Sequence, residues 1–195
     1  IQVFKDKKMH THLMDRFLSS RGEDCLWYAD LLRGQDIPGF DDSLLKVLRK
    51  EEDDATRIGL MAFLSLPAGN AAIPVFKEIT DMNKPQLLLA MVKAANRFPA
   101  EVSREFNREI FEATHDPEVK ACSAVGLYRD DPERLFAVIQ AMLGSGDPTE
   151  RRAGAVAAGE SGNEGFAKTL REMISRETDP SILSVLFRSL RQLND

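Results

Sequence analysis

The chain has 195 residues, of which 43% are hydrophobic and 29% are charged, and its formal net charge is −5. This length and composition support a packed core, and they exclude a disordered chain, a collagen-like repeat and a small disulfide-stabilised protein. The negative charge argues against nucleic acid or an anionic membrane as the default partner, because both select basic proteins.

The chain begins Ile1-Gln2-Val3-Phe4 without a methionine, which predicts a segment excised or processed from a longer protein. No apolar stretch of signal-peptide or membrane-spanning length follows the first lysines, so we expect no membrane insertion of this segment. Cys25 and Cys122 lie far apart and outside any CxxC spacing, which predicts buried reduced thiols. These features favour a cytoplasmic setting.

Six expected helix starts recur at intervals of 31 or 32 residues. They stand at Gly22-Glu23, Asp53-Asp54, Lys84-Pro85, Asp116-Pro117, Asp147-Pro148 and Asp179-Pro180. In the Asp-Pro copies, the carboxylate can accept hydrogen bonds from the free amides of the first helical turn, and proline suits the first helical position. Apolar residues follow at helical spacing, as at Val119, Cys122 and Val125. We call the helices that begin at these six positions the B helices.

A second amphipathic segment lies between successive B helices, and we call these segments the A helices. Their apolar stretches are Leu44–Leu48, Val75–Ile79, Val102–Phe111, Leu135–Leu143 and Phe166–Ile174. Asp131-Pro132 and Gly144 are start and stop signals for the fourth segment, and Asn163 begins the fifth. No segment combines strict alternation with hairpin turn signals, so we expect about twelve helices and no sheet.

The two periodic patterns together predict a single repeat domain over residues 1–195. The expected repeats are approximately residues 1–33, 40–66, 70–98, 100–129, 132–161 and 163–193. A two-helix unit of this length cannot bury its apolar face alone, so neighbouring units must stack on one another.

The B-helix sequences at 116–127 and 147–159 resemble HEAT repeats, in particular the short bacterial form first noted in phycobilin lyases. That family favours Asp-Pro, an apolar residue, an arginine and then small residues where two helices touch. The copy at Asp179-Pro180 matches moderately, and the three N-terminal copies match by register alone. The resemblance implies an all-α fold, a right-handed α-α superhelix (a HEAT/armadillo-like solenoid) of about six helix pairs, with the B helices lining the concave side.

Catalytic and metal-binding motifs are nearly absent, and we expect no enzyme, no catalytic residue, no cofactor and no metal site. His10 and His12 are two residues apart, which on a helix directs them away from each other. Residues 159–163 lack the final glycine of a nucleophile elbow and follow a helix rather than a strand. The acidic run Glu51–Asp54 lacks the spacing of a calcium loop and fits a helix N-terminus better.

Most phenylalanines coincide with apolar helix positions, which predicts that they belong to the core. These residues are Phe63, Phe76, Phe98, Phe106, Phe111, Phe136, Phe166 and Phe187. Trp27 and Tyr28 lie in a poorly matching first repeat, and two interpretations stay open for them: an exposed contact, or a seal over the end of the core.

The B helices are more basic than the chain as a whole: from the second to the sixth they carry nine basic residues and three acidic ones. The candidate partner-binding residues are Arg57, Lys93, Arg97, Lys120, Arg129, Arg152 and Arg188. Two interpretations stay open. The residues can form a functional basic stripe, or they can be structural, because cations suit helix C-termini and the fifth-position cation often bonds the neighbouring repeat in HEAT proteins.

The leading functional hypothesis is a non-catalytic protein–protein interaction scaffold or regulatory domain that presents its B helices to an acidic protein or peptide, or to another domain of its parent chain. A second hypothesis is a HEAT-like nucleic-acid-binding or DNA-glycosylase-like protein, which the net acidic charge disfavours. A third is a cytoplasmic regulatory domain of a membrane transporter or signalling protein. The resemblance to phycobilin-lyase repeats implies no lyase activity, because the shared motif is a packing motif.

Overall fold

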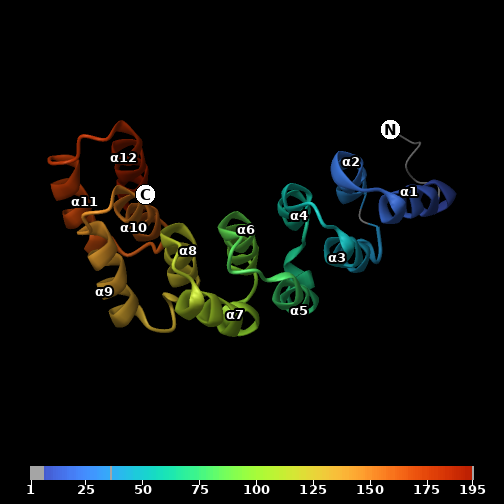
Figure 1. Ribbon diagram of the computed structural model, residues 1–195, viewed down its shortest axis with the longest axis horizontal. Coiled ribbons are helices and arrows are strands. Elements are labelled where there is room, and N and C mark those ends of the chain that lie inside the picture. The colour runs from blue at the N-terminus through green and yellow to red at the C-terminus, as the bar shows by residue number, and fades with distance from the viewer. Residues whose placement is uncertain (1–6, 36, 195) are drawn as a thin grey trace. The chain divides into compact units, whose positions relative to one another are not determined.

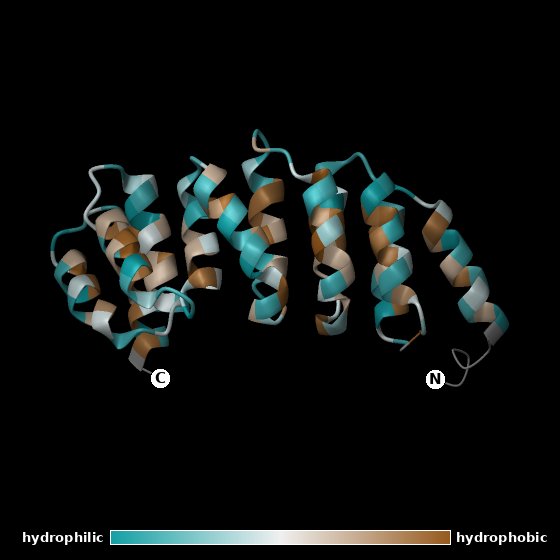
Figure 2. Cartoon of the chain, turned by 90° about the horizontal axis from the view of Figure 1, so that it is seen from below, coloured by the Kyte–Doolittle hydropathy of each residue, from teal (hydrophilic) through white to brown (hydrophobic). Residues whose placement is uncertain are grey.

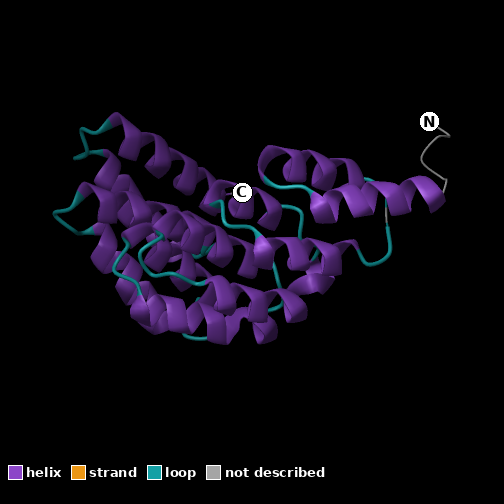
Figure 3. Ribbon diagram, turned by 45° about the vertical axis from the view of Figure 1, so that its right-hand side comes forward, coloured by secondary structure: helices purple, strands orange, loops and turns teal. Residues whose placement is uncertain are grey.

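A computed structural model describes residues 7–35 and 37–194 (Figure 1). Over these residues it contains twelve α-helices, and Figure 3 shows only helices and loops there. The predictions of an all-α chain, of about twelve helices and of no sheet are therefore confirmed for the described residues.

The helices alternate between the predicted A and B positions. The A positions hold α1 (Lys7–Ser19), α3 (Phe40–Lys50), α5 (Gly69–Ile79), α7 (Ala100–Ala113), α9 (Pro132–Leu143) and α11 (Ala167–Ile174). The B positions hold α2 (Gly22–Arg33), α4 (Asp54–Met61), α6 (Pro85–Ala95), α8 (Pro117–Leu127), α10 (Pro148–Glu160) and α12 (Pro180–Asn194). The short 3-10 turns η2 (Leu66–Ala68) and η3 (Glu164–Phe166) lead into α5 and α11. Every B helix thus begins within its predicted dipeptide.

Aspartate caps explain why these starts are so regular. Asp116 accepts hydrogen bonds from the backbone N–H groups of Glu118 and Val119, both at 3.0 Å. Asp53 accepts the N–H and the hydroxyl of Thr56 at 2.8 and 2.6 Å. Each cap satisfies an amide that has no partner inside its own helix, so the carboxylate fixes where the helix begins.

The chain divides into two compact units, unit 1 (residues 1–103) and unit 2 (residues 104–195). In unit 1, α4 packs between α2 and α6, and α3 packs between α1 and α5. In unit 2, α10 is the central helix and contacts α8, α9 and α12, while α11 packs on α12. Figure 2 shows apolar and polar residues on the same helices, as expected where each helix buries one side against its neighbours.

Small residues bring the helices of unit 2 close together. The buried side of α10 consists of alanine and glycine, including Ala155, Ala158 and Gly159. A Cβ atom added to Gly159 would lie 2.7 Å from the Cα atom of Ser189, so glycine allows the backbones of α10 and α12 to approach. Small residues therefore lie where helices touch, as the HEAT-like pattern led us to expect.

The aromatic residues and cysteines divide between core and surface. Cys25 and Cys122 are buried and form no disulfide with each other, as predicted. The phenylalanine expectation is wrong for Phe187, whose side chain is 58% exposed because no described helix covers its side of α12. Trp27 is 60% exposed and packs edge-on against Tyr28 with ring centroids 4.9 Å apart, so the structure favours the exposed-contact interpretation for the tryptophan.

No single helix among the described residues is both long enough and apolar enough to cross a membrane. One bent pair, Asp54–Met61 with Leu66–Ile79, meets the length and composition requirement in combination, with an angle of 118° between its halves.

Candidate partner-binding surface

The seven candidate residues all come from B helices or from the turns that follow them. In unit 1 they are Arg57 on α4, Lys93 on α6 and Arg97 just after α6; in unit 2 they are Lys120 on α8, Arg129 just after α8, Arg152 on α10 and Arg188 on α12. Four of the seven contact other groups of the chain, and three extend into solvent.

In unit 1, two of the candidate arginines make contacts within the chain that stabilise the fold. Arg97 donates a hydrogen bond from Nη2 to the carbonyl oxygen of Met61 at 2.8 Å, at the C-terminal end of α4. The largely buried side chain of Arg57 lies 3.5 Å from the carboxylate of Asp54. Asp54 also pairs with Lys84 Nζ at 2.9 Å, so this carboxylate is shared between two cations.

In unit 2, two further candidates have partners within the chain. Arg152 forms an ion pair with Glu118, which joins α10 to α8. Lys120 Nζ lies 5.6 Å from the ring centroid of the buried Phe111, within the range of a cation–π contact. These four residues fit the structural interpretation of the basic stripe.

Lys93, Arg129 and Arg188 are different, because all three are exposed and none bonds or pairs with another residue of the described chain. Asp130 follows Arg129 in the chain, and its carboxylate is bound by Arg104 Nε at 2.7 Å. Neither α6 nor α12 contains an acidic residue. These three cations are therefore the part of the predicted stripe that is available to a partner.

Arg151 is the fifth residue of its repeat counted from Asp147, and it connects two segments of unit 2. Its Nε atom donates to Glu177 at 3.0 Å, and its Nη1 atom donates to the carbonyl oxygens of Ser145 and Gly146 at 3.1 and 3.0 Å. Glu177 lies in the turn before α12, so Arg151 connects α10 to the segment that leads into α12. The structural interpretation of the fifth-position arginine is confirmed at this position.

Glu51 is a buried carboxylate with a comparable structural role in unit 1. Its side chain is 4% exposed and accepts hydrogen bonds from the N–H groups of Glu52, Asp53 and Gly22 at 2.9, 3.1 and 3.3 Å. Burial acts to raise the pKa of Glu51, but the three backbone donors and the nearby charge of Arg21 outweigh it and lower the pKa. Asp53 caps α4 and Asp54 lies in its first turn, as the sequence predicted, whereas Glu51 is the C-cap residue of α3.

Replacing Glu51 with glutamine should lower the free energy of unfolding at neutral pH by about 1–2 kcal/mol, because hydrogen bonds to a charged acceptor stabilise more than those to a neutral one. A lowered pKa in the folded state contributes stability above the ordinary glutamate pKa, and this stability is lost as the pH falls through the folded-state value. The Glu51→Gln variant should therefore lose less stability in acid than the parent chain. Urea unfolding followed by circular dichroism at neutral and acidic pH measures both effects.

The exposed neighbour Glu52 provides the control for this experiment. Glu52→Gln removes the same charge from the same turn without removing a buried acceptor, so its stability should follow the parent chain at every pH. Equal effects at the two positions would show that net charge, rather than the Glu51 hydrogen bonds, sets the acid sensitivity.

The described residues line cavities in both units. In unit 1, a cavity of about 700 Å³ lies between α3 and η2 and is lined by residues that include Asp42, Leu45 and Phe63. In unit 2, a cavity of about 560 Å³ lies beside α9 and α11, next to Arg151 and Glu177. Neither lining contains a histidine or a cysteine.

Across the described chain, no group of three or more His, Cys, Asp or Glu side chains is placed to hold a metal ion.

The helix starts at Asp116 and Asp147 and the small residues of α10 fit the HEAT-like pattern predicted from the sequence. The resemblance to HEAT repeats rests on these residues of the chain itself and stays a prediction. The chain matches no protein-family model, no curated protein and no solved structure.

Proposed function

We propose that this chain is a non-catalytic scaffold of HEAT-like repeats, in which about six helix pairs form a right-handed α-α superhelix and the B helices present a surface to an acidic protein or peptide. The observation that carries this proposal is the set of three exposed cations, Lys93, Arg129 and Arg188, that have no counter-ion among the described residues. A partner that supplies carboxylates would neutralise them.

Apolar side chains next to two of these cations support a mixed acidic and apolar ligand. Leu89 lies one helical turn before Lys93, and Val125 lies one turn before Arg129; both are partly exposed. Exposed ion pairs contribute only about 0.2–1 kcal/mol each, so apolar anchors must supply most of the affinity. The cations then set the rate of association and the preference for an acidic partner.

The charge distribution favours a protein partner over nucleic acid. Glu118, Glu150 and Glu160 lie on α8 and α10 among the cations, and Glu118 neutralises Arg152 directly. A regular array of phosphates would meet these carboxylates, whereas a peptide can place its acidic residues to avoid them.

Reversing the charge of all three free cations should weaken the binding of an acidic peptide at least about tenfold, because three favourable pairs of up to about 1 kcal/mol each become repulsive. The variant is Lys93→Glu with Arg129→Glu and Arg188→Glu. The measurement is fluorescence anisotropy at low salt with labelled peptides rich in Asp and Glu and containing one or two leucines. Arg97 and Arg152 are unsuited to this test because their reversal would also disturb their contacts with Met61 and Glu118.

A matched control changes the net charge equally on the A helices. Lys46, Arg108 and Arg171 are exposed on α3, α7 and α11, and their reversal to Glu should leave peptide binding within about twofold of the parent chain. Equal losses in the two triple variants would mean that net charge alone attracts the peptide. Binding of duplex DNA without any binding of the acidic peptides would favour the nucleic-acid hypothesis instead.

A further inference from the structure

The first and the last B helix each expose an aromatic side chain. Trp27 on α2 is 60% exposed, and Phe187 on α12 is 58% exposed. Partly buried apolar residues extend each patch at helical spacing: Leu31 lies one turn after Trp27, and Leu183 lies one turn before Phe187. Each helix therefore carries a two-residue apolar stripe, in which the aromatic side chain is mostly exposed and the leucine is partly buried.

Each of these two helices contacts another B helix of its own unit. Within unit 1, α2 meets α4 through Leu26, which lies against Gly59. Within unit 2, α12 meets α10 through Ser189, which lies against Gly159. The stripes of Trp27 and Phe187 lie on other sides of these two helices.

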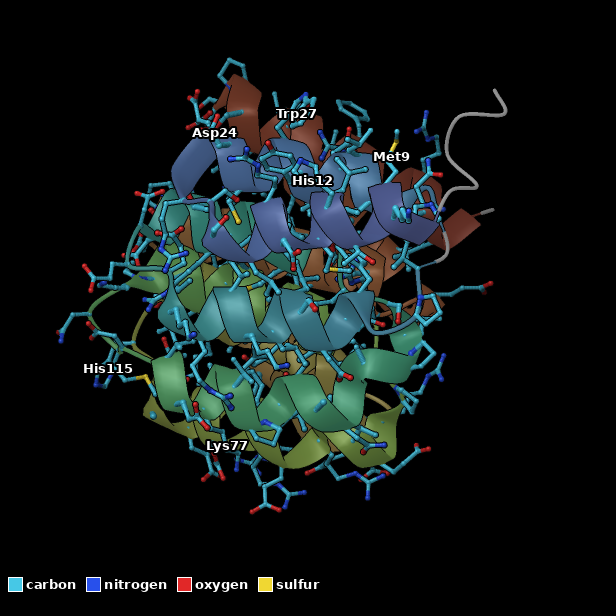
Figure 4. All side chains as sticks on the ribbon, turned by 90° about the vertical axis from the view of Figure 1, so that its right-hand side faces the viewer. Met9, His12, Asp24, Trp27, Lys77 and His115 are labelled. Carbon is cyan, nitrogen blue, oxygen red and sulfur yellow. The ribbon has the colours of Figure 1, made fainter. Side chains whose placement is uncertain are left out.

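The two helices also carry opposite charge. Helix α2 contains three acidic residues and one basic residue, whereas α12 contains two arginines and no acidic residue. Asp24 on α2 and Arg191 on α12 are exposed and have no ion pair with another described residue. Figure 4 shows Asp24 and Trp27 projecting from α2 on the side away from the helices beneath it, so the carboxylate and the aromatic ring are presented together.

We propose that the chain self-associates head to tail, with α12 of one copy packed against α2 of a second copy. Trp27 and Phe187 supply the apolar contact, and Asp24 and Arg191 supply opposite charges beside it. The same charges oppose a symmetric contact of α2 with α2 or of α12 with α12, because like charges would then meet. One helix face on each side makes a small interface, so the association is weak and depends on protein concentration.

Sedimentation velocity of the full chain from low to several hundred micromolar tests this proposal. The mass of the parent chain should rise above the 21.8 kDa of one copy as the concentration increases, and the rise should be smaller at high salt. The variants Trp27→Lys and Phe187→Asp should each remain monomeric, because each lacks one of the two required faces. An equimolar mixture of the two should form dimers and nothing larger, because only one intact α12 and one intact α2 remain to pair.

Each other outcome overturns the head-to-tail contact. Self-association of Trp27→Lys alone would show that α2 is not required, and self-association of Phe187→Asp alone would show that α12 is not required. A parent chain that stays monomeric throughout the concentration range would refute self-association itself. Both side chains are exposed, so thermal unfolding of the variants should match the parent and exclude misfolding as the cause.

Exchanging the two charges tests the proposed ion pair between Asp24 and Arg191. Asp24→Arg should weaken self-association, and adding Arg191→Asp to the same chain should restore it, because the pair is then rebuilt with its signs reversed. Failure of the second change to restore the association would remove Asp24 and Arg191 from the contact. Self-association and acidic-peptide binding use different residues and different measurements, so either proposal can fail alone.

Discussion

Replacing Phe166 with alanine should lower the free energy of unfolding by about 3–5 kcal/mol, because the change leaves a large cavity in the core of unit 2. The Phe166 side chain is 0% exposed. Its ring stacks on Phe136 with centroids 4.4 Å apart and lies 6.3 Å from the ring of Tyr128. The structure around the missing ring can collapse only partly, because Phe166 and these two neighbours come from three different segments. Urea unfolding followed by far-ultraviolet circular dichroism measures the loss.

Phe187→Ala is the matched control, since it deletes the same atoms from a side chain that is mostly exposed. Its effect should stay within about 0.5–1 kcal/mol of the parent chain at protein concentrations where the chain is monomeric. A loss at position 187 equal to that at position 166 would mean that Phe187 is packed in solution. A small loss at position 166 would contradict the aromatic core of unit 2.

Replacing Gly159 with valine should destabilise the chain by about 3 kcal/mol, through the overlap of its side chain with α12. The added Cβ atom would lie 2.7 Å from both the Cα and the Cβ atom of Ser189. The Cα atom of Ser189 belongs to the backbone of α12, so the overlap is relieved only if the whole of α12 moves away from α10. Hydrogen exchange should therefore accelerate in the amides of α12 more than in those of α8, and urea unfolding should show the loss of stability.

Gly146→Val provides the comparison, because a Cβ atom at Gly146 has no other atom within 4 Å. This exposed turn position should tolerate the valine with a change of stability within about 0.5 kcal/mol. Equal destabilisation at the two glycines would point to valine's own conformational preferences. The close approach of α10 and α12 would then not be the cause.

The helices could be predicted from the sequence because their determinants are close in the chain. The cap Asp116 bonds Val119, only three residues away, and Asp53 bonds Thr56 at the same separation. Apolar residues at helical spacing likewise define which side of each helix is buried. Pattern and capping agree at each of the three Asp-Pro starts of the B helices, so these helix boundaries follow from local chemistry.

The candidate binding surface could be predicted only in part, because pairing depends on residues far apart in the chain. The sequence placed the cations on the B helices, but Arg152 meets Glu118 at a separation of 34 residues, and Arg97 meets Met61 at a separation of 36. In both cases the partners meet because α8 packs against α10 and α4 packs against α6. Only the folded chain shows that these arginines have partners, while Lys93 has no counter-ion among the residues that the structure describes.

The two exposed aromatic residues show the same division between local and long-range information. Periodicity assigned Phe187 to an apolar position and left Trp27 undecided, but periodicity does not reveal whether a neighbouring helix covers that side. By itself, the sequence determined the all-helical class, the helix starts and the apolar side of most helices, because capping bonds and helical spacing act over a few residues. Tertiary structure alone decided which charges remain free and which apolar stripes remain exposed, because both depend on the helix that packs alongside, and that helix comes from another repeat.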